Sequence, residues 1–172
     1  KIVMVACGTA YHACYVGRYV YEKLLGIPVE VDIASEFRYR DPILRPGEAV
    51  MVISQSGETA DTLAALRLAK EKGCSVIGLG NVVGSSIARE ADKVIYTWAG
   101  PEIAVASTKA YVVQSALMAL LAFAMALEKG TMNESDAKAL IDKLLHTLPA
   151  DIKRILDMRD EIYDSVEFFA DK

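Results

Sequence analysis

The sequence predicts an α/β protein: a three-layer αβα sandwich around a five-stranded parallel sheet with flavodoxin-like strand order. Three observations predict this fold. Short apolar runs alternate with longer segments of helical periodicity, most of the runs are apolar throughout, and clusters of glycine and hydroxyl residues follow several of them. Such continuously apolar strands are typical of a parallel sheet that helices cover on both faces.

Five short runs have the length and composition of strands. Most are nearly continuous in Val, Ile, Met and Ala, and the second alternates apolar with acidic residues. The expected strands are Ile2–Ala6, Val29–Ile33, Ala49–Ile53, Ser75–Leu79 and Val94–Thr97.

Helices are expected in the intervals between these strands. The first is expected over Tyr11–Leu25, because Gly26 and Pro28 stop a helix. A short helix is expected over Ala34–Arg40, capped by Ser35 and with a solvated basic face. The next carries Leu63, Leu66 and Ala69 and ends at Gly73. A short helix capped by Ser85 or Ser86 should end near Glu90, and a long helix is expected over Thr108–Lys129.

The long helix carries no charge over the 18 residues of Ala110–Leu127, close to the length of a membrane span. Gln114 and Ser115 interrupt this stretch, and six alanines make it only moderately apolar. We therefore interpret it as a close-packed helix inside a domain or at a subunit interface, and we expect no contact with a membrane.

The 172 residues are expected to form a domain over 1–132 and a helical extension over 133–172. In the extension, Ser135 is expected to cap one helix and Pro149 to open another over Ala150–Phe169, with His146 exposed. The chain opens on Lys1 and at once on a strand, so it is expected to be part of a longer protein against which the amphipathic extension packs.

Composition narrows the function classes. The net charge is -4 and Lys and Arg form no run, which argues against a nucleic-acid partner. Cys7, Cys14 and Cys74 have no metal-binding spacing and are an odd count for disulfides, so we expect no metal, no cofactor and a reducing cytoplasm. No signal peptide is visible.

The most informative stretch is Val50–Thr62, where an apolar strand ends in a cluster of hydroxyl residues before a helix. A helix N-terminus has free N–H groups and attracts anions. The loop has no Lys or Arg, so a phosphate there would be held by neutral donors. The alternative interpretation is that Ser56 only caps the helix, with Glu58 favourably placed in its first turn.

Two more polar clusters precede expected helices and are candidate ligand sites for the same reason. Cys7-Gly8-Thr9 follows the first strand without being a dinucleotide fingerprint or a P-loop, and Cys7 is a candidate nucleophile or a small residue beside a ligand. His12 is a candidate acid–base group or a structural histidine. Gly100–Lys109 precedes the long helix, where Lys109 could steer an anion or be solvated.

Three segments together resemble the glutamine–fructose-6-phosphate aminotransferase family, in its first sugar isomerase (SIS) lobe. They are Cys7–His12, Ser54–Thr62 and Gly100–Tyr111. The resemblance covers about residues 1–130, so the domain over 1–132 is expected to be a SIS domain. It implies that Ser54, Gln55, Ser56 and Thr59 hold a phosphate, that Cys7, Gly8 and Thr9 line the sugar, and that Val105, Ala106 and Ser107 close the pocket.

Family members make glucosamine-6-phosphate from fructose-6-phosphate and glutamine. The resemblance therefore implies a glutaminase domain and a second SIS lobe in the same full-length chain, and a homodimer. In the family the second lobe supplies most acid–base groups, so no catalytic residue is assigned here and the fragment is expected to be inactive alone. Ala10 and Ala104 depart from the family's usual Ser and Gly.

Two alternatives remain open. A sugar-phosphate-sensing regulatory module should carry a basic helix-turn-helix segment, and none is visible. A stand-alone phosphosugar isomerase would need acid–base residues in this lobe or from a dimer partner, and Glu58 and His12 are the candidates within the lobe.

Overall fold

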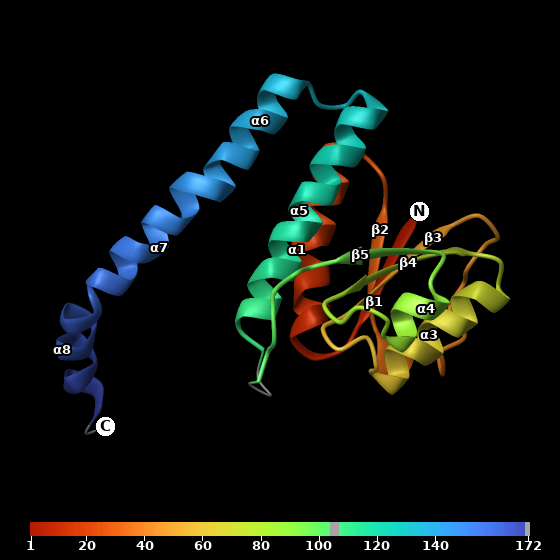
Figure 1. Cartoon of the computed structure of the whole chain (residues 1–172), viewed down its shortest axis with the longest axis horizontal. Helices are drawn as coiled ribbons and strands as arrows, with labels where there is room; N and C mark the ends of the chain where they lie inside the picture. Colours follow the sequence, from red (N-terminus) through yellow and green to blue (C-terminus); the bar gives the residue numbers. More distant parts are fainter. Residues whose placement is uncertain (104–106, 171–172) are drawn as a thin grey trace. The chain divides into compact units, whose positions relative to one another are not determined.

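The computed structural model, shown in Figure 1, describes residues 1–103 and 107–170. Its described part contains a parallel sheet of order β2-β1-β3-β4-β5, which confirms the predicted fold class and flavodoxin-like order. The strands are β1 (Ile2–Ala6), β2 (Val29–Ile33), β3 (Ala49–Ser54), β4 (Ser75–Gly80) and β5 (Lys93–Tyr96).

Helices cover both faces of this sheet. On one face, α1 (Gly8–Leu25) and α5 (Lys109–Lys129) lie side by side. The opposite face carries α2 (Ala34–Phe37), α3 (Ala60–Glu71) and α4 (Ser86–Glu90).

Strand β3 shows why the sheet needs two helical layers. Successive side chains of a strand point to opposite faces. Val50 and Val52 belong to the core beneath α3, together with Leu66. Met51 and Ile53, at the intervening positions, are also buried. Both faces of β3 are therefore apolar and covered.

Helix α5 is long and apolar enough to cross a membrane by length and composition alone. It packs along α1, and at the closest approach Gly17 of α1 leaves room for Met118 of α5. Its buried row recurs at every fourth residue, as expected for one face of a helix packed on a protein core. The row consists of Ala110, Gln114, Met118, Ala122 and Ala126.

Several predicted helix boundaries are wrong. Helix α1 begins at Gly8 rather than Tyr11, because Gly8 adopts a positive φ of 59° that turns the chain directly from β1 into the helix. Helix α2 ends at Phe37 and Ser35 is not its cap. Arg40 consequently lies outside the helix and pairs with Glu30 and Asp32.

Residues 132–172 form a second compact unit of helices, separate from the unit over 1–131. Its elements are α6 (Glu134–Asp142), a π-helical turn (Lys143–Thr147), α7 (Leu148–Asp157) and α8 (Arg159–Ala170). Asn133, not Ser135, caps α6 by accepting the N–H of Asp136 at 2.9 Å. The single helix expected over Ala150–Phe169 is interrupted at Met158.

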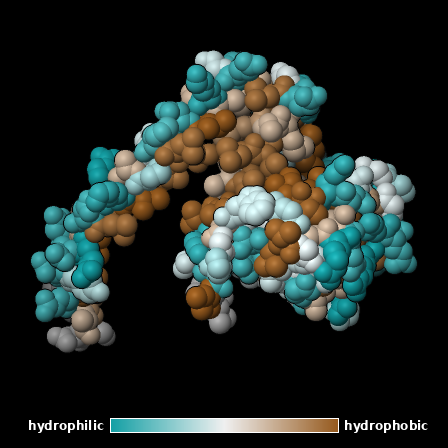
Figure 2. Space-filling view, in the orientation of Figure 1, coloured by the Kyte–Doolittle hydropathy of each residue, from teal (hydrophilic) through white to brown (hydrophobic). Residues whose placement is uncertain are grey.

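One side of these helices is apolar and exposed, as Figure 2 shows along their length. Leu148, Ile152, Ile155 and Ile162 are each at least 45% exposed. His146 is exposed as expected, and its ring bonds to the Asp142 carboxylate one turn earlier.

The connection between α4 and β5 is held by the carboxylate of Asp92. Asp92 accepts the N–H of Val76 at 2.7 Å and pairs with Lys70 at 2.9 Å. The Val76 N–H bond and then Lys70 lower the pKa of Asp92. A lowered folded-state pKa stabilises the fold above the carboxyl's unfolded value, about 3.9, and this contribution disappears as pH falls through the folded value.

We expect Asp92→Asn to lower the free energy of unfolding at neutral pH, and its deficit against the wild type to shrink as pH falls below about 4. Urea unfolding between neutral and acidic pH measures this difference. Glu71→Gln, at an exposed carboxylate of α3, is the control. A deficit that is the same at every pH would show that the charge of Asp92 plays no part.

Candidate functional site

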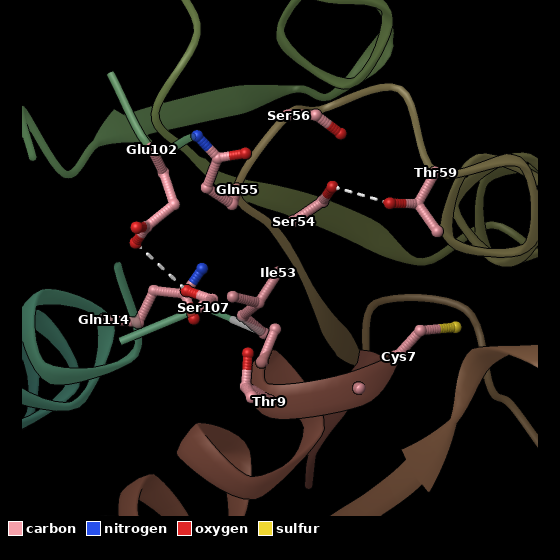
Figure 3. A pocket seen from close by; sticks show the side chains of 12 residues that line it. Cys7, Thr9, Ile53, Ser54, Gln55, Ser56, Thr59, Glu102, Ser107 and Gln114 are labelled. Atoms are coloured by element: carbon pink, nitrogen blue, oxygen red, sulfur yellow. Dashed lines mark hydrogen bonds between the residues drawn. The ribbon is translucent and has the colours of Figure 1, made fainter. Parts of the chain in front are cut away.

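A pocket of about 390 Å³ opens at the carboxyl edge of the sheet, within the size range of small-molecule sites. Residues from the beginnings of α1 and α3 and from the segment before α5 meet there (Figure 3). Its described lining consists of Cys7, Gly8, Thr9, Ala10, Ile53, Ser54, Gln55, Ser56, Thr59, Glu102, Ser107 and Gln114.

The loop from β3 to α3 is closed by hydroxyl groups. Ser54 Oγ accepts the N–H of Gly57 at 3.0 Å and shares a hydrogen bond of 3.0 Å with Thr59 Oγ1. Ser56 Oγ accepts the N–H of Glu58 at 3.2 Å. Because this oxygen accepts, the hydroxyl proton of Ser56 remains available for a ligand.

The N-terminus of α3 carries free donors. Thr59 is the N-cap residue, but no side chain caps the helix, so the interpretation of Ser56 as a simple cap is wrong. The first intrahelical bond joins the N–H of Leu63 to the carbonyl of Thr59 at 2.9 Å. The N–H groups of residues 60–62 therefore have no acceptor within the helix.

This loop is fixed against α4. Gly57 has a positive φ of 67°, and a Cβ there would lie 2.1 Å from Ser85 Oγ. Its carbonyl accepts the N–H of Ile87 at 3.0 Å. Glu58 accepts the N–H of Ser86 at 2.7 Å, and this bond lowers the pKa of the Glu58 carboxyl. These contacts fix the loop over Ser54–Thr59 against the start of α4.

The α5 side of the pocket is built around Glu102. Its Oε2 accepts the N–H of Ala110 at 3.0 Å and the hydroxyl of Ser107 at 3.4 Å. A carboxylate is favourable at a helix N-terminus, so Glu102 occupies the start of α5 from within the chain. Gln114, one turn beyond Ala110, completes this side of the pocket.

Every described member of the predicted site set lines this one pocket. They are Cys7, Gly8, Thr9, Ser54, Gln55, Ser56, Thr59 and Ser107. The predicted Val105 and Ala106 lie outside the described residues. Glu102 and Gln114 line the pocket but were not predicted as site residues. A single amide inside an uncharged helix was the available signal for Gln114.

The candidate acid–base residues do not line the described pocket. His12 is exposed on α1 with its ring against the edge of Tyr11, and Glu58 is engaged by Ser86. Lys109 is exposed and outside the described lining as well. Across the described residues, no group of three or more His, Cys, Asp or Glu side chains could hold a metal ion.

The SIS domain family matches residues 1–124 of this chain.

The chain belongs to the SIS domain family.

Relatives of this SIS domain carry a common name. The chain is 60% identical over 162 residues to a Clostridium tetani protein named glutamine–fructose-6-phosphate aminotransferase [isomerizing]. The alignment covers 94% of this chain and 26% of that protein. It is 52% identical over 170 residues to the protein of that name from Symbiobacterium thermophilum, covering 99% of this chain and 28% of the relative. The chain thus spans about a quarter of the length of these relatives.

A solved structure agrees with these relatives. The C-terminal domain of glucosamine-fructose-6-phosphate aminotransferase from Francisella tularensis matches with a TM-score of 0.90 and 40% identity. The match covers 99% of this chain and 48% of that one. The likeness therefore extends beyond residue 124, where the match to the SIS domain family ends.

Gly57 allows a prediction about the rigidity of the loop. Gly57→Ala combines left-handed strain with overlap against Ser85, so we expect it to lower the unfolding free energy by about 2–4 kcal/mol. Gly84→Ala is the matched control, because Gly84 also has a positive φ, 73°, with nothing within 4 Å of an added Cβ. It should cost only the strain, about 1–2 kcal/mol.

Adding Ser85→Gly to Gly57→Ala should recover the difference, since it removes the overlapping atoms. Denaturant unfolding of the four variants, including Ser85→Gly alone, measures these values. Equal losses from Gly57→Ala and Gly84→Ala would contradict the contact between Gly57 and Ser85.

Proposed function

We propose that the pocket binds fructose-6-phosphate and that this SIS domain is the first SIS lobe of an enzyme that makes glucosamine-6-phosphate from fructose-6-phosphate and glutamine. The observation that carries the proposal is the meeting of free helix N–H groups and hydroxyls in one pocket.

The phosphate is assigned to the loop over Ser54–Thr59. A phosphate monoester carries about 1.5 to 2 negative charges near neutral pH and takes several hydrogen bonds. The hydroxyl of Ser56 and the Ser54–Thr59 hydroxyl pair line the pocket, and the N–H groups of residues 60–62, which follow Thr59, have no acceptor within α3. Gln55 adds an amide to the same pocket. No Lys or Arg belongs to the described lining, so the anion is held by neutral donors.

The sugar is assigned to the remaining lining. Helix α1 begins at Gly8 without a side-chain cap, so its first N–H groups, together with Thr9, face a ligand of the pocket. Cys7 and Gly8 are small and let the sugar approach the backbone. Ser107 closes the opposite side. Val105 and Ala106 keep their expected role as part of that closure.

The carboxylate of Glu102 sets the direction of the ligand. It repels a phosphate and accepts hydrogen bonds from hydroxyl groups. In Figure 3, Glu102 lies across the pocket from Ser56 and Thr59. The phosphate therefore points to α3 and the sugar hydroxyls toward α5.

The whole enzyme is inferred from the relatives, of whose length this chain spans about a quarter. We propose that a glutaminase domain and a second SIS lobe complete the chain, and that two copies form a homodimer. The acid–base groups of isomerisation would come from outside this lobe, because neither His12 nor Glu58 lines the described pocket and the Glu102 carboxylate there already accepts two hydrogen bonds. We propose a cytoplasmic location, without cofactor, metal, nucleic acid or membrane contact.

The two alternatives have less support. A stand-alone phosphosugar isomerase would use Glu58 or His12, and the carboxylate of Glu58 is already bonded to Ser86. The high-identity relatives named above are aminotransferases.

Calorimetric titration of the chain tests the proposal. Fructose-6-phosphate and glucosamine-6-phosphate should bind saturably, and unphosphorylated fructose should not, because the cradle recognises the phosphate. Ser56→Ala should weaken both phosphorylated ligands by about 1–3 kcal/mol, as expected for the loss of a hydrogen bond to a charged group.

Ser75→Ala is the matched control, because Ser75 is exposed at the other end of its strand. It should leave the affinities unchanged. No binding of any sugar phosphate would contradict the proposal that this lobe recognises one unaided. An unchanged affinity in Ser56→Ala would place the phosphate elsewhere.

A further inference from the structure

Gln114 is the one polar residue in the buried row of α5. The row packs Ala110, Met118, Ala122 and Ala126 inward at four-residue spacing. Packing alone favours an apolar side chain at position 114, because Met or Leu would fill the same space without a polar group. The amide at this position therefore needs a reason other than the helix packing.

The side-chain carbonyl of Gln114 has no partner in the described structure. The residue is 2% exposed, and its Oε1 accepts no hydrogen bond. A buried carbonyl without a donor costs about 1–3 kcal/mol. The stability of the fold does not explain this cost, whereas a role of the amide in binding a ligand of the pocket does.

The position of Gln114 identifies the ligand group. It lines the pocket beside Ser107 and on the same side as Glu102, across from Ser56 and Thr59 (Figure 3). The amide of Gln114 and the carboxylate of Glu102 thus share one side of the pocket. The carboxylate repels a phosphate there, whereas a sugar hydroxyl can donate to the carboxylate and can hydrogen-bond the amide as donor or acceptor.

We infer that Gln114 is a specificity-determining residue whose side-chain amide hydrogen-bonds a hydroxyl of the bound sugar. This inference rests on the proposed function, because it assumes that the phosphate occupies the loop over Ser54–Thr59. It assigns α5 a direct part in recognition, with Glu102 as a positioning residue that fixes the first turn of the helix through Ala110.

The test compares two ligands in Gln114→Met. Methionine is close to glutamine in size but has no amide to donate or accept a hydrogen bond. Affinity for fructose-6-phosphate should fall roughly threefold to tenfold, as expected for one hydrogen bond. Affinity for inorganic phosphate, followed by ³¹P NMR, should not change, because that ion has no hydroxyl-bearing carbon chain to reach Gln114.

Stability gives the second readout. Because Gln114 Oε1 has no partner in the described protein, Gln114→Met should leave the melting temperature unchanged or raise it. Ser115→Ala is the control: it is the next residue on α5, its hydroxyl bonds to the Tyr111 carbonyl and it lies outside the described lining. Gln114→Leu serves in the same comparison if the methionine variant does not fold.

Three outcomes separate the possibilities. An unchanged affinity of Gln114→Met for fructose-6-phosphate overturns the inference while leaving the proposed function intact. A lowered melting temperature with equal weakening of both ligands also overturns it, because it indicates a structural role. If neither ligand binds to the wild type, the proposed function fails first, and the inference fails with it.

Discussion

The common direction of all the strands is the constraint on which the site depends. In a parallel sheet every strand ends at the same edge, and every helix that follows a strand begins there. Strands β1 and β3 are neighbours, yet α1 covers one face and α3 the other. The chain therefore diverges at this point and leaves a pocket between two helix N-termini. Unpaired N–H groups gather there as a consequence of the topology.

The residues around this pocket determine which chemical groups it can bind. Ser54 and Thr59 bond to each other, and Gly57 lies against Ser85, so the loop keeps its shape without a cation. Helix α5 also begins at this edge, but Glu102 occupies its first turn. The pocket consequently has hydroxyl groups at the α3 side and a carboxylate at the α5 side. That asymmetry fits a molecule with an anion at one end and hydroxyl groups at the other.

Local sequence predicts the parts of this account that local physics controls. The apolar runs predict all the strands to within a residue or two, since burial on both faces leaves few alternatives. Hydroxyl clusters after strands predict the pocket residues at Ser54–Thr59 because the polar groups have to lie where the sheet ends. Helix starts are less predictable: the left-handed Gly8 advances α1 by three residues, and Thr59 rather than Ser56 precedes α3. The positions of Glu102 and Gln114 in the pocket depend on how α5 packs along α1. The four-residue spacing of α5 indicates that the helix has a buried face, but it does not indicate which residues of that face lie beside the pocket.

The most direct test of the account is a crystal structure of the chain with fructose-6-phosphate bound. The account predicts phosphate oxygens within hydrogen-bond distance of Ser56 Oγ and of the first N–H groups of α3, with sugar hydroxyls directed toward Gln114 and Glu102. A phosphate bound on the α5 side, or bound outside the pocket, would contradict it.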